Sequence, residues 1–331
     1  MRLTPRGRAL LTAGAWLAAT ALAVVALRAL GWRAALDAVR AARPGWVALA
    51  VACHASIVAL WAWQTSVLWP RGPDAPPPRH ATAFEVQALT AMATNTVPAF
   101  LGQATGVALL AERGGIGTAA ALGVFAQHNL VEGVAKVAVL LAAAQVAPLP
   151  PALRRAAWAL TGLVVAMAAL LALAASAGRA QPGQRVPGAG PGLTGRARAL
   201  VRRWAHALDA LRAPWRLFGA LLLALAMKAA EAAGWWAVER ALGVRPRPGS
   251  PVLALAATNL ASAVPATPGN LGVYEGAAYA AYHTLLGVPR ETAVALALVG
   301  HACYLVPLVG MGWAMLSAQQ LGRWRRRRPP R

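Results

Sequence analysis

Charged side chains recur at helical spacing inside a segment that is otherwise apolar. His128, Glu132 and Lys136 are four residues apart, so a helix places all three on one face. A charge at the centre of a bilayer costs about 2.5 to 3.5 kcal/mol on insertion scales, so each needs a partner or a function. A purely structural pair of Glu132 with Lys136 is the alternative, since such pairs stabilise helices by about 0.2 to 0.5 kcal/mol.

A second apolar segment carries a similar polar face. Lys228, Glu231 and Glu239 fall within an arc of about 80° when each residue turns a helix by about 100°. We expect the two faces to turn towards each other, towards the broken segments described below or towards a water-filled cavity. Together with two further residues they predict an intramembrane charge or proton relay of His128, Glu132, Lys136, Lys228, Glu231, Glu275 and His301. For His301 the alternative is a hydrogen-bonded packing role.

Residues 262–276, SAVPATPGNLGVYEG, break the backbone inside a region apolar enough to lie in lipid. Pro268 and Gly269 predict a turn, Asn270 a helix cap, and Gly272 a bare first helical turn. Free N–H groups there, with the helix dipole, would bind an anion such as a lipid phosphate. The predicted headgroup site comprises Asn95, Pro98, Gln103, Pro265, Thr267, Pro268, Gly269, Asn270 and Gly272. Alternatively, the proline and glycine cluster only bends a helix.

Two segments of the chain, 81–113 and 251–286, share this broken pattern. Each contains Ala-Thr-Asn, then Val-Pro-Ala, then a glycine followed by an amide residue. A proline and glycine cluster interrupts each one midway, which predicts a re-entrant helix-turn-helix. Three full spans separate them, an odd number, so they would enter from opposite sides as an inverted repeat around a midplane site. Two ordinary kinked spans in each segment are the alternative.

The elements that position these residues are membrane-spanning helices. Of the 331 residues, 58% are hydrophobic and 13% charged, and no strand-like alternation is present. About 20 apolar residues cross the hydrocarbon core, and the segments that qualify are 9–30, 45–69, 116–146, 156–177, 215–243 and 291–318. The abundant alanines and glycines allow close helix packing. The predicted fold is an all-α, polytopic integral membrane bundle with two re-entrant helical hairpins.

The chain reads as one membrane domain, 1–331, with two halves. The first half is 1–177 with its hairpin at 81–113, and the second is 215–331 with its hairpin at 251–286. Between them, 178–214 is a basic, Gly- and Pro-rich segment that predicts a cytoplasmic linker. Arginines at both ends of the chain place the N- and C-termini in the cytoplasm of a cell with the protein in its inner (plasma) membrane.

Charge and cysteine usage exclude several classes of function. The net charge is +22, but the arginines crowd the ends and loops as in cytoplasmic loops that face anionic lipid, so no nucleic-acid partner is expected. Cys53 and Cys303 lie in separate apolar segments and predict packing residues, without a disulfide framework or metal spacing. We expect no catalytic residues, no metal and no cofactor.

The run from Val264 to Gly276, VPATPGNLGVYEG, is similar to the Pro-x-(Thr/Ser)-Pro-Gly-Gly-Leu-Gly-x-x-Glu element of a known family. On this run, and on weaker similarity along most of the chain, the sequence resembles the lysylphosphatidylglycerol synthase transmembrane-domain family of flippase-like proteins, which includes hopanoid-associated members. The chain departs from the family pattern in its first half, where Gln103 and Gly106 replace Glu and Arg. Further departures are His128, Asn129 and Glu132 in place of a Glu-Arg-x-x-Asp pattern, and His301 in place of an arginine.

The resemblance implies a flippase or transporter that moves an anionic or isoprenoid-type lipid between leaflets, with membrane lipids as partners. The alternative is a membrane-embedded enzyme, or a scaffold for enzymes of a polyprenyl or hopanoid lipid pathway. The enzyme alternative is weakened because no aspartate lies in a span and no DDxxD-type or HExxH motif is present.

Overall fold

The computed structural model describes residues 37, 39–71, 76–146, 151–177, 213–245, 247–262 and 267–327. All of the regular elements in these ranges are helical. The predicted first span at 9–30, nearly all of the predicted linker and Pro265 lie outside the described residues.

Four helices in the described part are long and apolar enough to cross a membrane. They begin with α3 (Pro44–Leu68), followed by α6 (Gly117–Ala144), α9 (Pro214–Ala241) and α12 (Arg290–Arg327). These four helices confirm the spans predicted at 45–69, 116–146, 215–243 and 291–318. A further helix, α7 (Pro151–Ala177), includes the whole segment predicted at 156–177.

The first broken segment forms two helices that pack against each other. Helix α4 (His80–Thr96) and helix α5 (Ala99–Gly114) are separated by only Val97 and Pro98. Proline disfavours helical geometry in the residue before it, and Val97 is extended, with φ −125° and ψ 171°. Gly102 on α5 lies against the backbone of Thr94 on α4, where a larger side chain would not fit.

The second broken segment is shorter and less regular. It consists of α10 (Ser250–Ala261), a 3₁₀ turn η2 (Pro268–Asn270), helix α11 (Val273–Tyr279) and a π-helical turn η3 (Ala280–Leu285). Gly269 adopts φ 62°, a conformation that favours glycine, and Asn270 is also left-handed at φ 54°. The helix breaks therefore occur where the sequence predicts them, while the re-entrant course and the inverted relation stay predictions.

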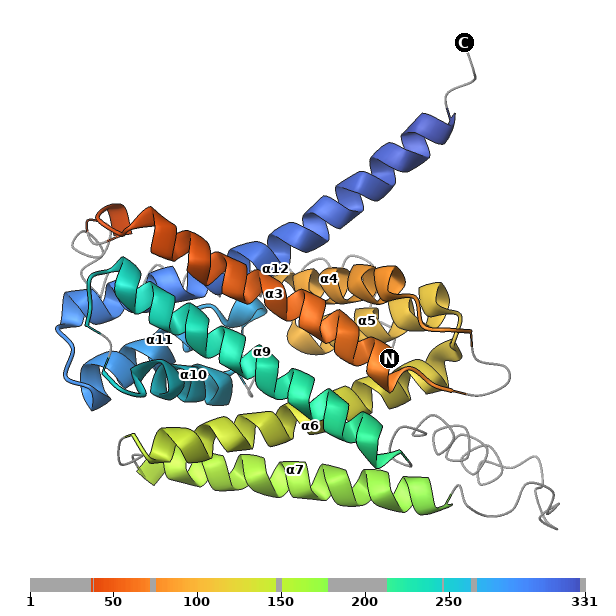
Figure 1. Cartoon of the computed structure of the whole chain (residues 1–331), viewed down its shortest axis with the longest axis horizontal. Coiled ribbons are helices and arrows are strands. Elements are labelled where there is room, and N and C mark those ends of the chain that lie inside the picture. Colours follow the sequence, from red (N-terminus) through yellow and green to blue (C-terminus); the bar gives the residue numbers. More distant parts are fainter. Residues whose placement is uncertain are drawn as a thin grey trace, which may run out of the picture.

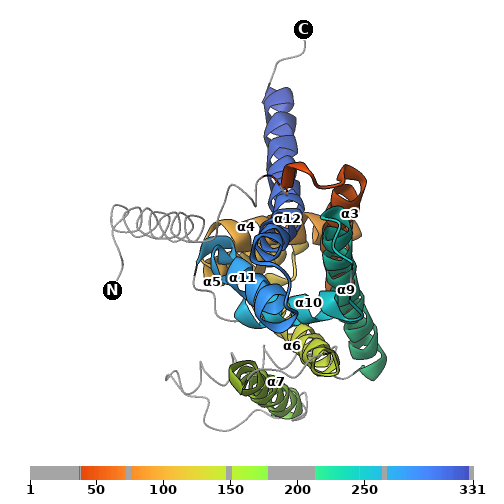
Figure 2. The same cartoon turned by 90° about the vertical axis from the view of Figure 1, so that its left-hand side faces the viewer.

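The helices are arranged so that both broken segments lie beside the same long helices (Figure 1). In two views, α3 runs along α9, and α7 lies at the edge of the bundle beside α6 (Figure 1, Figure 2). Helix α12 continues beyond the bundle at its C-terminal end (Figure 1). Small residues allow the helices to approach closely, as at Gly312 of α12, where a Cβ atom would lie 2.8 Å from the backbone oxygen of Ala88 on α4.

Two apolar clusters hold the bundle together. One surrounds Trp235, Tyr274 and Tyr282 and joins α9, α10, α11 and α12. The other surrounds Trp69 and Phe125 and joins α3, α4, α5, α6 and α9. Members of both clusters line the cavity described next, so the cavity lies between the two halves of the core.

Candidate functional site

A cavity of about 220 Å³ lies where the broken segments meet the long helices. Its lining combines charged, amide and tyrosine side chains from eight helices or turns. The polar lining residues are Thr94, Asn95, Gln103, His128, Asn129, Glu132, Lys136, Lys228, Glu231, Thr258, Asn259, Ser262, Asn270, Tyr274 and Tyr304.

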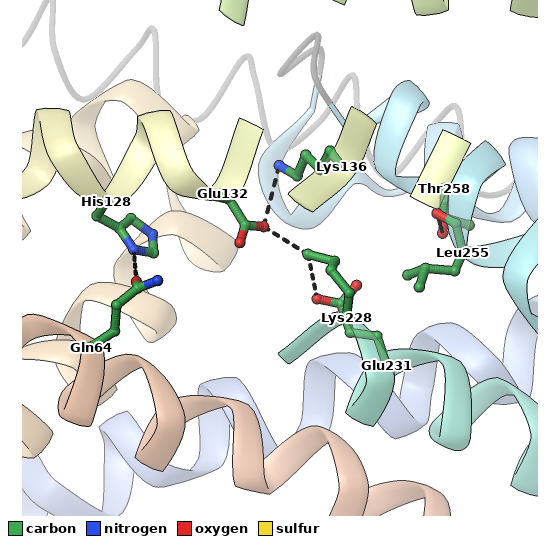
Figure 3. Close-up of polar contacts among 8 residues, drawn as sticks. All are labelled: Gln64, His128, Glu132, Lys136, Lys228, Glu231, Leu255 and Thr258. Carbon is green, nitrogen blue, oxygen red and sulfur yellow. Dashed lines mark hydrogen bonds and ion pairs between the residues drawn. The ribbon is translucent and has the colours of Figure 1, made fainter. Parts of the chain in front are cut away.

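An ion-pair network forms one wall of the cavity (Figure 3). The Lys228 ammonium lies 2.7 Å from Glu132 Oε1 and 2.6 Å from Glu231 Oε1. Lys136 Nζ lies 3.6 Å from the same oxygen of Glu132. The network joins α6 to α9 through Lys228 and Glu231, whereas Glu239 of the same predicted face bonds to Ser250 and Tyr282 instead. Its two lysines balance its two glutamates. Lys228 is 5% exposed, so the pairing offsets a large desolvation cost.

His128 is fixed beside this network by neutral partners. Its Nδ1 is within hydrogen-bonding distance of Gln64 Oε1, and its ring stacks on Trp61 with centroids 5.0 Å apart. Gln64 in turn donates from Nε2 to the backbone oxygen of Ala220 at 2.7 Å. The imidazole is thus held between α6, α3 and α9.

The two broken segments present amide side chains to the same cavity. Asn95 and Gln103 come from the first segment, and Asn259 and Asn270 come from the second. The segments also touch at the break, because a Cβ atom on Gly269 would lie 2.9 Å from the backbone oxygen of Asn95. Glycine therefore allows an approach at this contact that a side chain would prevent.

Several residues around the cavity carry buried polar atoms without a protein partner. Within the described residues these atoms include Gln103 Oε1, Asn259 Nδ2, Asn270 Oδ1 and the indole nitrogen of Trp61. Buried polar groups are nearly always hydrogen-bonded, and each one left unpaired costs about 1 to 3 kcal/mol. Their concentration around one cavity is typical of a site that binds polar molecules.

Glu275 and His301 form a separate pair behind the cavity. His301 Nδ1 lies 2.8 Å from Glu275 Oε1, and the other carboxylate oxygen accepts the Gly272 N–H at 2.7 Å. Tyr274, which lines the cavity, stacks on His301 with ring centroids 4.3 Å apart. The pair therefore contacts the cavity wall through aromatic rings, since Tyr304, which also lines the cavity, lies 6.3 Å from His301 between ring centroids.

This geometry changes the interpretation of the second break. The residue in the cap position of α11 is Gly272, whereas the sequence predicts Asn270 there. The Gly272 N–H, expected to be free for an anion, is occupied by the chain's own carboxylate at Glu275. Thr267 Oγ1 donates to the backbone oxygen of Leu271 at 2.8 Å, so this hydroxyl also stabilises the turn.

The structure brings together about half of the residues predicted for the site. Those that line the cavity are Asn95, Gln103, His128, Glu132, Lys136, Lys228, Glu231 and Asn270. Those that shape the breaks or lie behind the cavity are Pro98, Thr267, Pro268, Gly269, Gly272, Glu275 and His301. Glu239 is separate from both groups, since it accepts hydrogen bonds from Ser250 and Tyr282.

Sequence reasoning missed other lining residues. The repeated Ala-Thr-Asn triplet contained the signal for Thr94, Thr258 and Asn259, because both copies face the cavity. Tyr274 and Tyr304 gave no such signal, since a tyrosine in an apolar helix is equally typical of packing.

Comparison with known proteins identifies the family of the chain. The family model described as the lysylphosphatidylglycerol synthase TM region matches residues 10–312. No match was found among curated proteins or among solved structures. The matched region includes both broken segments and every residue of the cavity, and the chain therefore belongs to the family of the lysylphosphatidylglycerol synthase TM region.

Proposed function

We propose that the protein moves a lipid with a polar headgroup between membrane leaflets through the cavity between its two broken segments. Family membership suggests a flippase-like membrane protein. The observation that carries the proposal is the convergence of both helix breaks and of the α6–α9 ion pairs on one polar cavity.

The chemistry of the lining supports a headgroup as the ligand. The amides of Gln103 and Asn259 each offer a donor and an acceptor, and one polar atom of each lacks a protein partner. A headgroup that carries hydroxyl or phosphate groups would satisfy such atoms, while its acyl chains stayed in the surrounding lipid. The volume of about 220 Å³ suits a headgroup and not a whole lipid.

The ion pairs would keep the cavity wall hydrated and charge-balanced. Lys228 is bound by two carboxylates, so it attracts an anionic headgroup only if one of these releases it. An exchange of Glu132 or Glu231 for a lipid phosphate is therefore the step that we propose for an anionic substrate. The expected partners remain membrane lipids, together with enzymes of lipid synthesis.

Lipid translocation in vesicles tests this function. Purified protein in liposomes is supplied with fluorescent phosphatidylglycerol, and chemical quenching reports the labelled lipid in each leaflet. The variants Gln103→Leu and Asn259→Leu conserve volume and remove the amides, and each is expected to slow translocation about tenfold. Gln145→Leu, at an exposed position just after α6, is the matched control and should not change the rate.

Two outcomes would contradict the proposal. Equal rates in vesicles with and without the protein, repeated with a zwitterionic and a glycosylated lipid, would exclude transport as the function. Chemical conversion of the recovered lipid, seen by mass spectrometry, would support the alternative of a membrane-embedded enzyme.

A further inference from the structure

A second, open groove lies at the other end of α9, where this helix leaves the apolar core. It has a volume of about 570 Å³ and is formed by the last turns of α9, the following loop and the first turn of α10. Its lining residues are Ala232, Ala233, Trp236, Arg240, Arg247, Pro248, Gly249, Pro251 and Val252. None of them lines the central cavity.

The groove carries positive charge that no carboxylate of the described residues neutralises through an ion pair. Its two charged lining residues are Arg240 and Arg247, and both are exposed. Among the described residues, no carboxylate forms an ion pair with either guanidinium. The neighbouring carboxylate of Glu239 is buried on another face, where it accepts hydrogen bonds from Ser250 and Tyr282.

An aromatic side chain positions one of these cations. The Arg240 guanidinium lies 5.3 Å from the ring centroid of Trp236, within range of a cation–π contact. Trp46 packs edge-on against the same ring, with centroids 5.1 Å apart and planes at 86°. Tryptophan and arginine at the end of an apolar span are typical of the headgroup level of a membrane.

The part of the groove that lies further from Arg240 along α9 is apolar. Ala232 and Ala233 lie two turns before Arg240, a distance of about 12 Å along the helix at 1.5 Å per residue. Pro251 and Val252 form the opposite wall. A ligand that fits both parts has a negative head and an apolar tail that points along the span.

We propose that this groove docks an anionic glycerophospholipid, with its phosphate between Arg240 and Arg247 and its acyl chain on the alanine floor. The groove and the central cavity are both lined by α9 and α10. On α9 the cavity ends at Glu231 and the groove begins at Ala232. A role for the groove as the port that loads the cavity rests on the proposed function, whereas docking itself does not.

Lipid retention tests the docking site. The protein is reconstituted in nanodiscs of equal amounts of dioleoyl phosphatidylglycerol and dioleoyl phosphatidylcholine, and the lipids retained after release are counted by native mass spectrometry. The wild type should retain the anionic lipid preferentially. Because each arginine near a membrane surface contributes about a tenfold attraction or less, Arg240→Gln combined with Arg247→Gln should lower this preference about 10- to 30-fold.

The opposite end of α9 supplies a matched control. Arg71 lies over the Trp215 ring at 5.2 Å, so it repeats the arginine–tryptophan contact, and Arg79 is exposed nearby in sequence. Neither residue lines the groove. Arg71→Gln combined with Arg79→Gln removes the same charge and should change the preference less than threefold.

A third variant tests the apolar floor with both charges intact. Ala233→Trp fills the floor from an exposed position and should lower retention of the anionic lipid about tenfold. An equal loss in the groove and control pairs would overturn the proposal, because it would indicate attraction by surface charge alone. Unchanged retention in Ala233→Trp would overturn it too.

A failure of lipid docking in the groove can be distinguished from a failure of lipid translocation through the cavity. Variants of the cavity amides should slow translocation about tenfold and keep the anionic lipid in the groove. Retention without any translocation in the wild type would leave docking in place and exclude transport.

Discussion

The two broken segments share a short sequence, but they differ in the regularity of their arms. In the first, α4 has 17 residues, α5 has 16, and two residues separate them. In the second, α10 has 12 residues and α11 has 7, followed by a π-helical turn. In both segments the Thr and Asn of the shared triplet line the cavity, whereas the arm after the break is a regular helix in the first segment only.

The two broken segments also differ in the position of the polar contacts that hold them to the rest of the structure. The first is held away from its break, where Arg113 contacts Glu85 and Gln319 donates to the same carboxylate at 2.6 Å. The second is held at its break, where the Gly272 N–H donates to the Glu275 carboxylate and this carboxylate pairs with His301. Because the second segment depends on buried contacts near the cavity, we expect it to be the more sensitive of the two to substitution of its polar contacts.

The largest effect is expected at Lys228, which lies between the two segments and belongs to neither. Lys228→Met removes the partner shared by Glu132 and Glu231, which leaves Glu231 unpaired in a buried site and Glu132 with Lys136 alone. The free energy of unfolding in mixed micelles should fall by about 3 to 5 kcal/mol.

A double variant shows whether this loss comes from the unpaired charge. Adding Glu231→Gln to Lys228→Met should recover part of the stability, because the unpaired charge is then removed. Strictly additive losses would mean that the ion pair contributes nothing as a pair.

The next largest loss of stability is expected for substitution of one glycine in each broken segment. Gly102→Ala pushes a methyl group into the Thr94 backbone and should cost about 1 to 3 kcal/mol. Gly269→Ala places a Cβ atom at φ 62° and close to the Asn95 oxygen, at a cost of about 1 to 2 kcal/mol. Thermal unfolding measures both. A negligible loss in either variant would show that its segment relaxes around the new methyl group.

A smaller effect is expected at the fastening of the second segment. Glu275→Gln keeps an oxygen for the Gly272 N–H and loses the charge-assisted bond to His301, so the unfolding free energy should fall by about 1 to 2 kcal/mol. In a cycle with His301→Gln the two losses should be less than additive. Full additivity of the two losses would show that Glu275 and His301 do not stabilise the protein as a pair.

The smallest effect is expected at the fastening of the first segment. Arg113→Gln breaks an ion pair whose side chains are 27% and 28% exposed, so solvent screens it and the loss should be about 0.2 to 1 kcal/mol. Salt should reduce the difference from wild type. Arg79→Gln, at an exposed position with no described ion pair, is the control. A loss at Arg113 as large as at Glu275 would reverse the comparison of the two segments.

Much of the fold could be predicted because membrane spans follow from length and hydropathy alone. The breaks were also predictable, since the residue before Pro98 cannot easily remain helical and Gly269 permits a left-handed turn. That Glu132 and Lys228 need partners was predictable as well, because a charge within a span requires one, whereas their pairing with each other was one of several expectations.

Contacts between distant residues could not be predicted in the same way. The carboxylate of Glu275 occupies the Gly272 N–H through a local cap, which competes with any ligand for that group. His301 is 26 residues further on, and its pairing with Glu275 depends on how α11 packs on α12. Helical periodicity gives the face of a residue but not the neighbour that the face meets.

The central claim is that both broken segments open onto one cavity on the route of the lipid. The chain has two cysteines, Cys53 and Cys303, so a cysteine-free background needs only two substitutions. Ala99→Cys and Ser262→Cys, one cavity-lining position from each broken segment, are then introduced and joined by a short cleavable thiol cross-linker, and lipid translocation is measured in vesicles. The account predicts that the cross-link forms and stops translocation, and that translocation resumes when the cross-link is cleaved. A cross-link that forms without slowing translocation, or two cysteines that cannot be joined, would contradict it.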